Sequence, residues 1–330
     1  GRAAKDILET AREEVAAMVN ADKKNIIFTS GATEANNLAI NCFDKVISSN
    51  IEHDSIRLHK NIDLIGVSNK GLYNLDELDS KLKFLTKNKN HRILVSTMFA
   101  NNETGIIQPI KKIADITKYY KVYFHSDAVQ AAGRIPIDMK YLGCDMITLS
   151  SHKIGGPMGA GALVTRNKKI LKSIFIGGAQ EDSFRAGTEP LLSLAGFGKA
   201  AKFCKKKSMI EVKTIRDEFE NILLKNSPEI VIIGKDSERL PNTILFSLPG
   251  IKSESLLIAL DIEGFDVSTG AACSSGQVEP SSTLKTMGLS DRLINSCIRI
   301  SLGSYNSIDE VHRFSKTLIK IKERFLEKVK

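Results

Sequence analysis

The chain has 330 residues, of which 42% are hydrophobic, 26% charged and 6% aromatic, and this composition excludes a disordered chain. Its 47 basic and 38 acidic side chains give a formal charge of +9; because they are spread along the chain, we expect a solvated basic surface rather than a nucleic-acid-binding protein. No apolar run is long enough to cross a bilayer, so no membrane partner is expected.

Helical and strand patterns alternate along the first 205 residues. Apolar side chains recur at helical spacing over residues 3–19, a strand pattern follows at 25–29, and the turn Ser30–Glu34 opens a helix that runs to Ile40. Further elements are predicted as strands at 62–67, 92–99, 122–125 and 146–150, and as helices at 75–84, 109–119 and from 190 past 200. This alternation predicts an α/β fold whose mainly parallel sheet has helices on both faces.

The pattern changes near residue 205. A charged helical stretch begins after Ser208, and a terminal helix starts at Ile308. Strand patterns between these helices occupy 230–233, 243–248 and 298–302. We therefore predict a large domain over residues 1–205 and a smaller α+β domain over residues 206–330.

The five cysteines are odd in number, widely spaced, and include no C-x-x-C pair. This spacing excludes a dense disulfide framework and indicates no structural zinc site, so no intrinsic metal is predicted. A reducing compartment suits such a chain, and its opening at Gly1 has no charged-then-apolar export leader. We expect a cytoplasmic protein, or one of an organelle matrix if the source is eukaryotic.

A lysine follows the predicted strand 146–150, within the stretch Ser150–Gly156. Its small and glycine neighbours allow the amine of Lys153 to project into a cleft, where it could form a Schiff base with a carbonyl cofactor. Taken alone, the stretch is more typical of an ordinary surface lysine.

An aspartate ends the predicted strand that contains Val122 and Phe124. Because an unpaired buried carboxylate is costly, Asp127 needs a partner, and a protonated pyridine nitrogen would be one. A strand-end carboxylate that caps a loop is the simpler interpretation of Asp127 by itself.

The turn Ser30–Glu34 joins a strand to a helix. The free N–H groups of a helix N-terminus and the hydroxyl of Thr33 suit a phosphate ester. A simple helix cap explains Thr33 equally well in isolation.

The order of these three elements, phosphate turn, strand-end aspartate and lysine, resembles the pyridoxal-phosphate enzymes of the class V aminotransferase group, and within it the cysteine desulfurases of the NifS/IscS type. The resemblance covers nearly the whole chain. The motifs that carry it are Gly31–Glu34, Asn101–Gly105, Asp127–Gln130, Ser150–Lys153, Arg185–Glu189, Ala272–Gly276 and Ile298–Gly303.

The resemblance implies the type I fold of pyridoxal-phosphate-dependent transferases, with a mainly parallel seven-stranded sheet and a smaller α+β C-terminal domain. It implies pyridoxal 5'-phosphate as cofactor. Lys153 would hold the cofactor as a Schiff base, Asp127 would pair with its pyridine nitrogen, and Gln130 would bond its ring hydroxyl. The phosphate would be gripped by Ala32, Thr33, Ser150 and His152, and by Thr188 from the neighbouring subunit of a homodimer.

Three further residues match family positions close to the reacting groups. His53 matches a histidine stacked over the cofactor ring and placed for proton transfer, although alone it would be more typical of a surface histidine. Asn102 matches an asparagine near the cofactor and the incoming amino acid. Arg299 is the candidate for the substrate carboxylate, because its planar fork makes two parallel hydrogen bonds; a structural ion pair is the competing interpretation.

Cys273 lies in a stretch of small residues, within a predicted loop over about 268–281. Such a loop suits a nucleophile that travels between a cofactor and an external acceptor, and thiolate chemistry requires exposure. An apolar core cysteine lies instead among large aliphatic side chains, as we expect for Cys297. The resemblance implies that the thiolate of Cys273 takes the sulfur of L-cysteine as a persulfide and that L-alanine is released.

The same resemblance implies protein partners. An iron–sulfur scaffold and other sulfur-acceptor proteins would receive the sulfur, for cluster assembly and for tRNA thiolation, without direct binding of nucleic acid. Cys273 would also serve as a transient ligand of a cluster held on the scaffold. The His-rich R-x-G-H-H-C pattern of short-loop desulfurases does not occur in the sequence.

Four features depart from the family pattern. The chain begins at Gly1, where the first long family helix starts, so the family's N-terminal segment is missing, and it ends at Lys330 without the extended tail that relatives use for scaffold docking. The connection from Thr33 to His53 looks shortened, and Asp182 stands where relatives commonly carry a basic residue. The alternatives are therefore a truncated or degenerate desulfurase-like partner-binding protein, or another class V aminotransferase-type enzyme.

Overall fold

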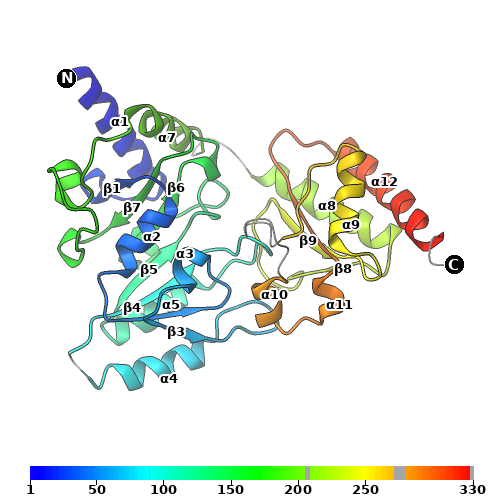
Figure 1. Cartoon of the computed structure of the whole chain (residues 1–330), viewed down its shortest axis with the longest axis horizontal. Coiled ribbons are helices and arrows are strands. Elements are labelled where there is room, and N and C mark those ends of the chain that lie inside the picture. Colours follow the sequence, from blue (N-terminus) through cyan, green and yellow to red (C-terminus); the bar gives the residue numbers. More distant parts are fainter. Residues whose placement is uncertain (89, 205–208, 271–279, 328–330) are drawn as a thin grey trace. The chain divides into compact units, whose positions relative to one another are not determined.

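The computed structural model describes residues 1–88, 90–204, 209–270 and 280–327, and for 326 and 327 the backbone alone. They form two compact units (Figure 1). The first consists of Gly1–Gly66, Tyr73–Ala100 and Gln108–Lys207, and the second of Val67–Leu72, Asn101–Ile107 and Ser208–Lys330. Two short segments from the first third of the chain therefore belong to the second unit.

A seven-stranded sheet forms the centre of the first unit, with strand order β1-β7-β6-β5-β4-β2-β3 (Figure 1). Strands β3, β2, β4, β5 and β6 are parallel, whereas β7 is antiparallel to both β6 and β1. This mainly parallel sheet confirms the predicted fold class. The strands are β1 (Ile26–Thr29), β2 (Lys45–Ser49), β3 (Ile62–Ile65), β4 (Ile93–Met98), β5 (Tyr123–Asp127), β6 (Met146–Ser150) and β7 (Gly161–Thr165).

Strands β2 and β7 were not among the predicted strands. Strand β2 has the sequence KVISS, and its two serines are completely buried. Because serine is polar, the sequence does not show that these positions are buried. Strand β7 begins at Gly161, directly after a glycine-rich stretch that reads as a turn. Tertiary packing, rather than local propensity, makes both segments strands.

The helices of the first unit flank the sheet, and α1 packs against α7 while α2 lies against β6 and β7. At Gly198 in α7, an added Cβ would lie 2.5 Å from the Cα of Ala11, which shows how closely the backbones of α1 and α7 approach. The α-helices are α1 (Arg2–Met18), α2 (Ala32–Ile40), α3 (Asp54–Arg57), α4 (Leu75–Leu85), α5 (Ile110–Tyr119), α6 (Met139–Leu142) and α7 (Leu191–Cys204).

The second unit contains a small antiparallel sheet in the order β10-β9-β8, with helices α8, α9 and α12 around its apolar core. Phe314 of α12 makes edge-on contacts with Phe219 and Phe265 within this core. Its elements are α8 (Ile210–Asn226), β8 (Val231–Ile232), β9 (Thr243–Ser247), α9 (Ser253–Ile262), α10 (Ser282–Thr286), α11 (Asp291–Ile294), β10 (Cys297–Ser301) and α12 (Ile308–Glu327). Among the helices that the structure describes, none combines the length and the apolar character required to cross a membrane.

The parallel strands β4, β5 and β6 end at the same edge of the large sheet. All residues of β4 and β6 are buried, as expected for strands covered on both faces. Asp127 ends β5 and Ser150 ends β6, and the segments that follow these carboxyl ends carry the residues proposed to bind a cofactor.

Candidate active site

Asp127 is buried, with 7% of its surface exposed, at the carboxyl end of β5. Its Oδ2 accepts a hydrogen bond from the side-chain amide of Asn36 at 2.8 Å, and its Oδ1 accepts one from the backbone N–H of Val129 at 3.0 Å. Burial raises the pKa of Asp127, while these two donors and the charges of His53 and Lys153 lower it. The carboxylate is therefore held by neutral donors, with the amine of Lys153 and the imidazole of His53 within electrostatic reach.

Lys153 lies in a short 3-10 helix (His152–Ile154) directly after β6, and its side chain is exposed. This turn ends at Gly155, whose positive φ of 86° favours glycine. Arg134 donates from Nη2 to the backbone carbonyl of Lys153 at 3.3 Å, and this bond helps to hold the turn. The neighbouring strands place Asp127 opposite Thr148, two residues before the end of β6.

Ser150 and His152 interact with each other beside the lysine. The hydroxyl of Ser150 lies 3.1 Å from Nδ1 of His152. Burial lowers the pKa of His152, and the charge of Lys153 lowers it further, so His152 is neutral at physiological pH. The pair can offer hydrogen-bond donors without adding a second charge.

Helix α2 begins at Ala32, and its N-cap Gly31 supplies no side-chain hydrogen bond to the free N–H groups. Thr33 is exposed in the first turn. A Cβ on Gly161 would lie 2.6 Å from the carbonyl carbon of Gly31, so β7 approaches this turn closely only because it begins with glycine. The turn therefore exposes backbone donors suited to an anion.

Glu34 supports the same turn from the other side. Its Oε2 accepts a hydrogen bond from the backbone N–H of Ser30 at 2.8 Å, and its Oε1 pairs with Arg185 at 3.0 Å. The segment that contains Arg185 and Thr188 is thereby connected to the helix N-terminus.

His53 is the N-cap of α3, and its Nδ1 accepts a hydrogen bond from the backbone N–H of Ser55 at 3.1 Å. The imidazole is exposed. Gln130 is partly exposed in the turn after β5, where its backbone carbonyl accepts a bond from Arg134 at 2.7 Å.

Glu52, which precedes His53, was not predicted as a site residue. It is 4% exposed, and its Oε1 accepts hydrogen bonds from the hydroxyl of Tyr73 and from the N–H of Met98. Burial raises the pKa of Glu52 to about 8, although Tyr73 and Met98 oppose this shift; the charge of Asp127 raises it. The adjacent Glu-His pair was the only sign of this arrangement in the sequence.

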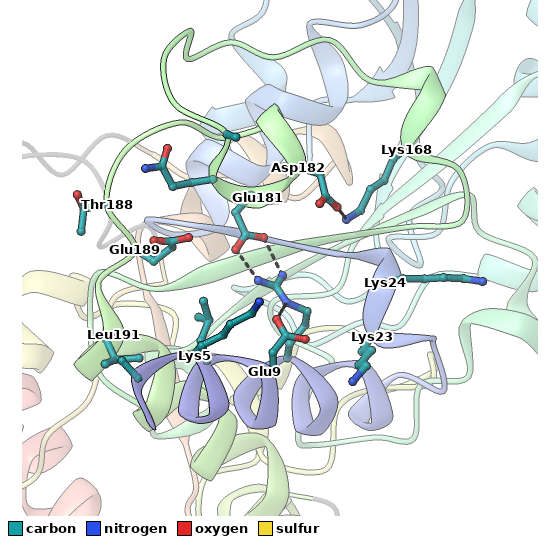
Figure 2. A pocket seen from close by; sticks show the side chains of 15 residues that line it. Lys5, Glu9, Lys23, Lys24, Lys168, Glu181, Asp182, Thr188, Glu189 and Leu191 are labelled. Carbon is teal, nitrogen blue, oxygen red and sulfur yellow. Dashed lines mark hydrogen bonds and ion pairs between the residues drawn. The ribbon is translucent and has the colours of Figure 1, made fainter. Parts of the chain in front are cut away.

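A separate pocket, with a volume of about 790 Å³, contains Thr188 on its wall (Figure 2). Its central feature is Glu181, which accepts hydrogen bonds from both terminal nitrogens of Arg12 at 2.6 and 2.7 Å and from the N–H of Phe28 at 2.9 Å. Glu181, Asp182 and Ser183 all have positive φ, between 47° and 67°.

Asp182 pairs with Lys168 at 2.6 Å on the rim of this pocket (Figure 2). Three successive left-handed residues other than glycine are strained, and the buried pair of Arg12 and Glu181 holds them in place. The acidic residue at 182, noted as a departure from the family pattern, thus has a local basic partner.

Asn102 and Arg299 both belong to the second unit, where Nη1 of Arg299 donates to the backbone carbonyl of Asn102 at 2.9 Å. Nε of Arg299 is buried without a partner among the described residues. The backbone of Arg299 also pairs with Ser268, at the start of the predicted loop. Cys273 itself lies outside the described residues.

The four described cysteines are poor nucleophile candidates. Cys42, Cys144 and Cys297 are buried, and burial raises the pKa of the Cys144 and Cys297 thiols to about 12. Burial also raises the pKa of Cys42. The partly exposed Cys204 donates to the carbonyl of Ile154 at 3.7 Å. The prediction that Cys297 is an apolar core residue is confirmed.

The residues of the first unit fit pyridoxal 5'-phosphate. The open N-terminus of α2 and the exposed hydroxyl of Thr33 are donors for the phosphate, and Asp127 offers a buried carboxylate for a protonated pyridine nitrogen. Lys153 supplies an exposed amine whose charge acts on Asp127. The donors at the start of α2, the carboxylate of Asp127 and the amine of Lys153 therefore match the phosphate, the pyridine nitrogen and the aldehyde of the cofactor.

Comparisons with known proteins cover almost the whole chain. Residues 1–314 match the family model of class-V aminotransferases. The cysteine desulfurase IscS of Dictyoglomus turgidum is 36% identical over 349 aligned residues, which include 100% of this chain and 86% of that protein. The solved NifS-like protein of Rickettsia africae has a TM-score of 0.88 and 37% identity, covering 98% of this chain and 89% of that one. SspA, solved in complex with cysteine, has a TM-score of 0.77 at 27% identity, covering 93% of this chain and 89% of that one.

Proposed function

The chain belongs to the class-V aminotransferase family and is a pyridoxal-phosphate-dependent cysteine desulfurase of the IscS/NifS type, and from this premise we propose which of its residues carry the reaction. The observation that carries the proposal is the environment of Asp127: a buried carboxylate with neutral donors on both oxygens and the charge of Lys153 within electrostatic reach. A carboxylate that only capped a surface loop would not need to be buried among such partners.

Eight residues of the first unit would hold the cofactor, seven from one subunit and one from a second. Lys153 would bind its aldehyde carbon, Asp127 its pyridine nitrogen and Gln130 its ring hydroxyl. When bound, pyridoxal phosphate supplies an electron sink for the α-carbon of the substrate amino acid. The phosphate would be bound by the backbone of Ala32, by Thr33, Ser150 and His152, and by Thr188 of a second subunit, so we propose a homodimer.

Asp127 must remain ionised to keep the ring nitrogen protonated. Burial raises the pKa of Asp127, whereas the hydrogen bonds from Asn36 and Val129 lower it. The charge of Lys153 also lowers this pKa. His53 lies at the start of α3 with its imidazole exposed, and we assign it proton transfer to and from the reacting amino acid.

Arg299 would bind the substrate carboxylate. Arg299 keeps a buried Nε–H without a partner among the described residues, and its Nη1 is already oriented by the carbonyl of Asn102. A guanidinium with one nitrogen held and another free suits a carboxylate that accepts two parallel bonds. Asn102 lies beside it, so we assign both residues to L-cysteine.

Cys273 would take the sulfur. Its thiolate forms a sulfur–sulfur bond with the sulfur of L-cysteine while the carbon–sulfur bond of the substrate breaks. The freed carbon gains a proton and L-alanine leaves, so that one cysteine and one thiol give one alanine and one persulfide. The raised thiol pKa values of Cys42, Cys144 and Cys297 support this choice among the five cysteines.

The persulfide would pass to acceptor proteins, and an iron–sulfur scaffold is the partner that we propose for a desulfurase of this type. Cys273 would also be the residue that can transiently ligate an iron–sulfur cluster held on that scaffold. We place the reaction in the cytoplasm, which the spacing of the cysteines supports.

The proposal is tested with Cys273→Ser, Lys153→Ala and a control, Cys204→Ser. Purified wild type should be yellow, lose its colour with borohydride, and release sulfide from L-cysteine in the presence of a thiol. Cys273→Ser should keep the colour and lose the persulfide detected by mass, while Lys153→Ala should lose both. Undiminished sulfide release by Cys273→Ser would overturn the nucleophile assignment. A colourless wild type without activity, even with added cofactor, would favour the partner-binding alternative.

A further inference from the structure

A continuous hydrogen-bonded chain of side chains joins Asp127 to His53. The amide nitrogen of Asn36 donates one hydrogen to Oδ2 of Asp127 at 2.8 Å and the other to Oγ of Ser55 at 2.9 Å. Oγ of Ser55 lies 2.9 Å from Nδ1 of His53. Neither Asn36 nor Ser55 was predicted as a site residue, and the two are 19 positions apart in the sequence.

The direction of each of these hydrogen bonds follows from what its two partners can donate or accept. Asp127 accepts only, so the nitrogen of the Asn36 amide, and not its oxygen, must face the carboxylate. The second N–H of that amide then points at Ser55, whose oxygen accepts it. The backbone N–H of Ser55 also donates to Nδ1 of His53, so this nitrogen is an acceptor, and the hydroxyl of Ser55 donates its hydrogen to it.

Nδ1 of His53 therefore accepts two hydrogen bonds, one from the Ser55 hydroxyl and one from the Ser55 backbone N–H at 3.1 Å. A nitrogen that accepts twice cannot also carry a proton. The proton of the neutral imidazole is consequently on Nε2, the nitrogen that makes neither of these bonds.

The hydrogen-bonded series of side chains is fixed at Asn36. Asn36 is completely buried in α2, as are Ala35 and Leu38 of the same helix, and α2 packs against β6 and β7. Oδ1 of Asn36 has no partner among the described residues, so the amide is oriented by its nitrogen alone. Rotating the amide would place its oxygen against the carboxylate of Asp127 and leave Ser55 without a donor.

We propose that Asn36 and Ser55 are positioning residues that couple the carboxylate of Asp127 to the imidazole of His53 and hold the neutral imidazole in its Nε2–H form. The inference rests on the proposed roles of Asp127 and His53 and adds to them. The carboxylate assigned to the cofactor nitrogen thereby also sets which nitrogen of the proton-transferring histidine is a donor.

Side-chain ¹⁵N spectra of His53 test the proposal, with the His53 signals assigned from a His53→Gln spectrum. The spectra are recorded on the purified protein as isolated and after removal of cofactor. The wild type should show an unprotonated Nδ1 and a protonated Nε2 at a pH where the ring is neutral. Ser55→Ala should move the Nδ1 signal toward that of a protonated nitrogen, because one of its two donors is lost. Ser55→Thr keeps the hydroxyl and should restore the wild-type spectrum.

Asn36→Leu tests the coupling over distance, because it removes both amide bonds without touching His53. It should change the His53 spectrum in the same direction as Ser55→Ala, and the double variant should show less than the sum of the two changes. Arg57→Gln, which breaks only the Arg57–Asp54 pair at the surface of α3, is the matched control and should leave the spectrum unchanged. If Asn36→Leu fails to fold, the comparison of Ser55→Ala with Ser55→Thr still tests whether the Ser55 hydroxyl sets the protonated nitrogen of His53.

A wild-type-like His53 spectrum in Ser55→Ala would overturn the proposal. So would a change of equal size in Arg57→Gln, since that would indicate a general loosening of α3. Failure of the proposed function is recognised separately. An inactive or colourless wild type would contradict that function, but its His53 spectra could still show the predicted protonation. In the active enzyme, Ser55→Ala should lower kcat with little change in KM, and Ser55→Thr should recover most of it.

Discussion

Glu52 and Asp127 are two buried acids of the same unit; burial raises the pKa of Glu52 to about 8, and the negative charge of Asp127 adds to this shift. Oε2 of Glu52 has no partner among the described residues, which is consistent with a carboxyl that is neutral at physiological pH. Of the two acids, Asp127 is the one whose charged form is favoured by hydrogen bonds from Asn36 and Val129 and by Lys153, so it is the one suited to the cofactor nitrogen. The adjacent Glu52 instead anchors the turn before His53 to Tyr73 and β4.

Replacing Glu52 by Gln should change how stability depends on pH. Because the folded-state pKa of about 8 lies above the ordinary value of 4.5, the folded wild type retains a proton that the unfolded chain releases, and it loses stability as pH rises from about 4.5 to about 8. Glu52→Gln has no such proton, so its melting temperature relative to wild type should increase over this range. Across this pH range, the free energy of unfolding of Glu52→Gln relative to that of the wild type should increase by on the order of a few kcal/mol at most. Parallel curves for the two proteins between pH 5 and 8 would contradict the assignment.

Glu181→Gln should destabilise the first unit by about 3 kcal/mol, because it removes the buried carboxylate that pairs with Arg12 and leaves only the partly exposed Glu9 as its charged partner. The same change should release the strained residues 181–183 and weaken the affinity for pyridoxal phosphate through the Arg185–Glu34 contact. Chemical unfolding and cofactor titration measure the two effects. Asp115→Asn, which breaks the exposed pair with Lys111, is the control and should cost about 1 kcal/mol or less. Equal losses in both variants would rule out a special role for the buried pair.

Gly161→Ala should weaken cofactor binding more than its size suggests. The added Cβ would lie 2.6 Å from the carbonyl carbon of Gly31 and 3.0 Å from the N–H nitrogen of Ala32, so the turn that exposes donors to the phosphate must move. We expect a loss of about 1–3 kcal/mol in stability and an increased dissociation constant for pyridoxal phosphate. Gly303→Ala, whose Cβ would meet nothing closer than 3.7 Å, should do neither. Unchanged affinity in Gly161→Ala would show that the phosphate is not bound at this turn.

Arg299→Lys should raise KM for L-cysteine about tenfold or more, because a lysine cannot keep the bond to the carbonyl of Asn102 and also offer a parallel pair of donors to a carboxylate. Cofactor colour should be retained, since Arg299 and Asn102 belong to the second unit. Steady-state kinetics and the absorption spectrum check both statements. Arg292→Lys, an exposed substitution on α11, should behave as wild type. An unchanged KM would favour a purely structural role for Arg299.

Much of the fold was predictable because local signals and tertiary structure agree. The helix over 3–19, the strand at 146–150 and the terminal helix from Ile308 are observed as α1, β6 and α12 within one or two residues. The missed strands β2 and β7 are short, and one is half polar while the other begins with glycine, so their burial depends on neighbouring strands. Segments 67–72 and 101–107 belong to the second unit although they lie far from it in sequence, and no local composition marks them.

The sequence by itself determined the order of the chemical groups: a glycine turn with Thr33, an aspartate at the end of a strand, a lysine after the next strand and a cysteine in a stretch of small residues. These signals are local, because each depends on a residue type and on the element next to it. Only the tertiary structure decided which neutral side chains serve those groups, since Asn36 meets Asp127 and Ser55, and Glu52 meets Met98, through contacts between segments that are far apart in the sequence. Hydrogen bonds of this kind depend on distances of a few ångströms between segments that are remote along the chain, and no local pattern of residues records them.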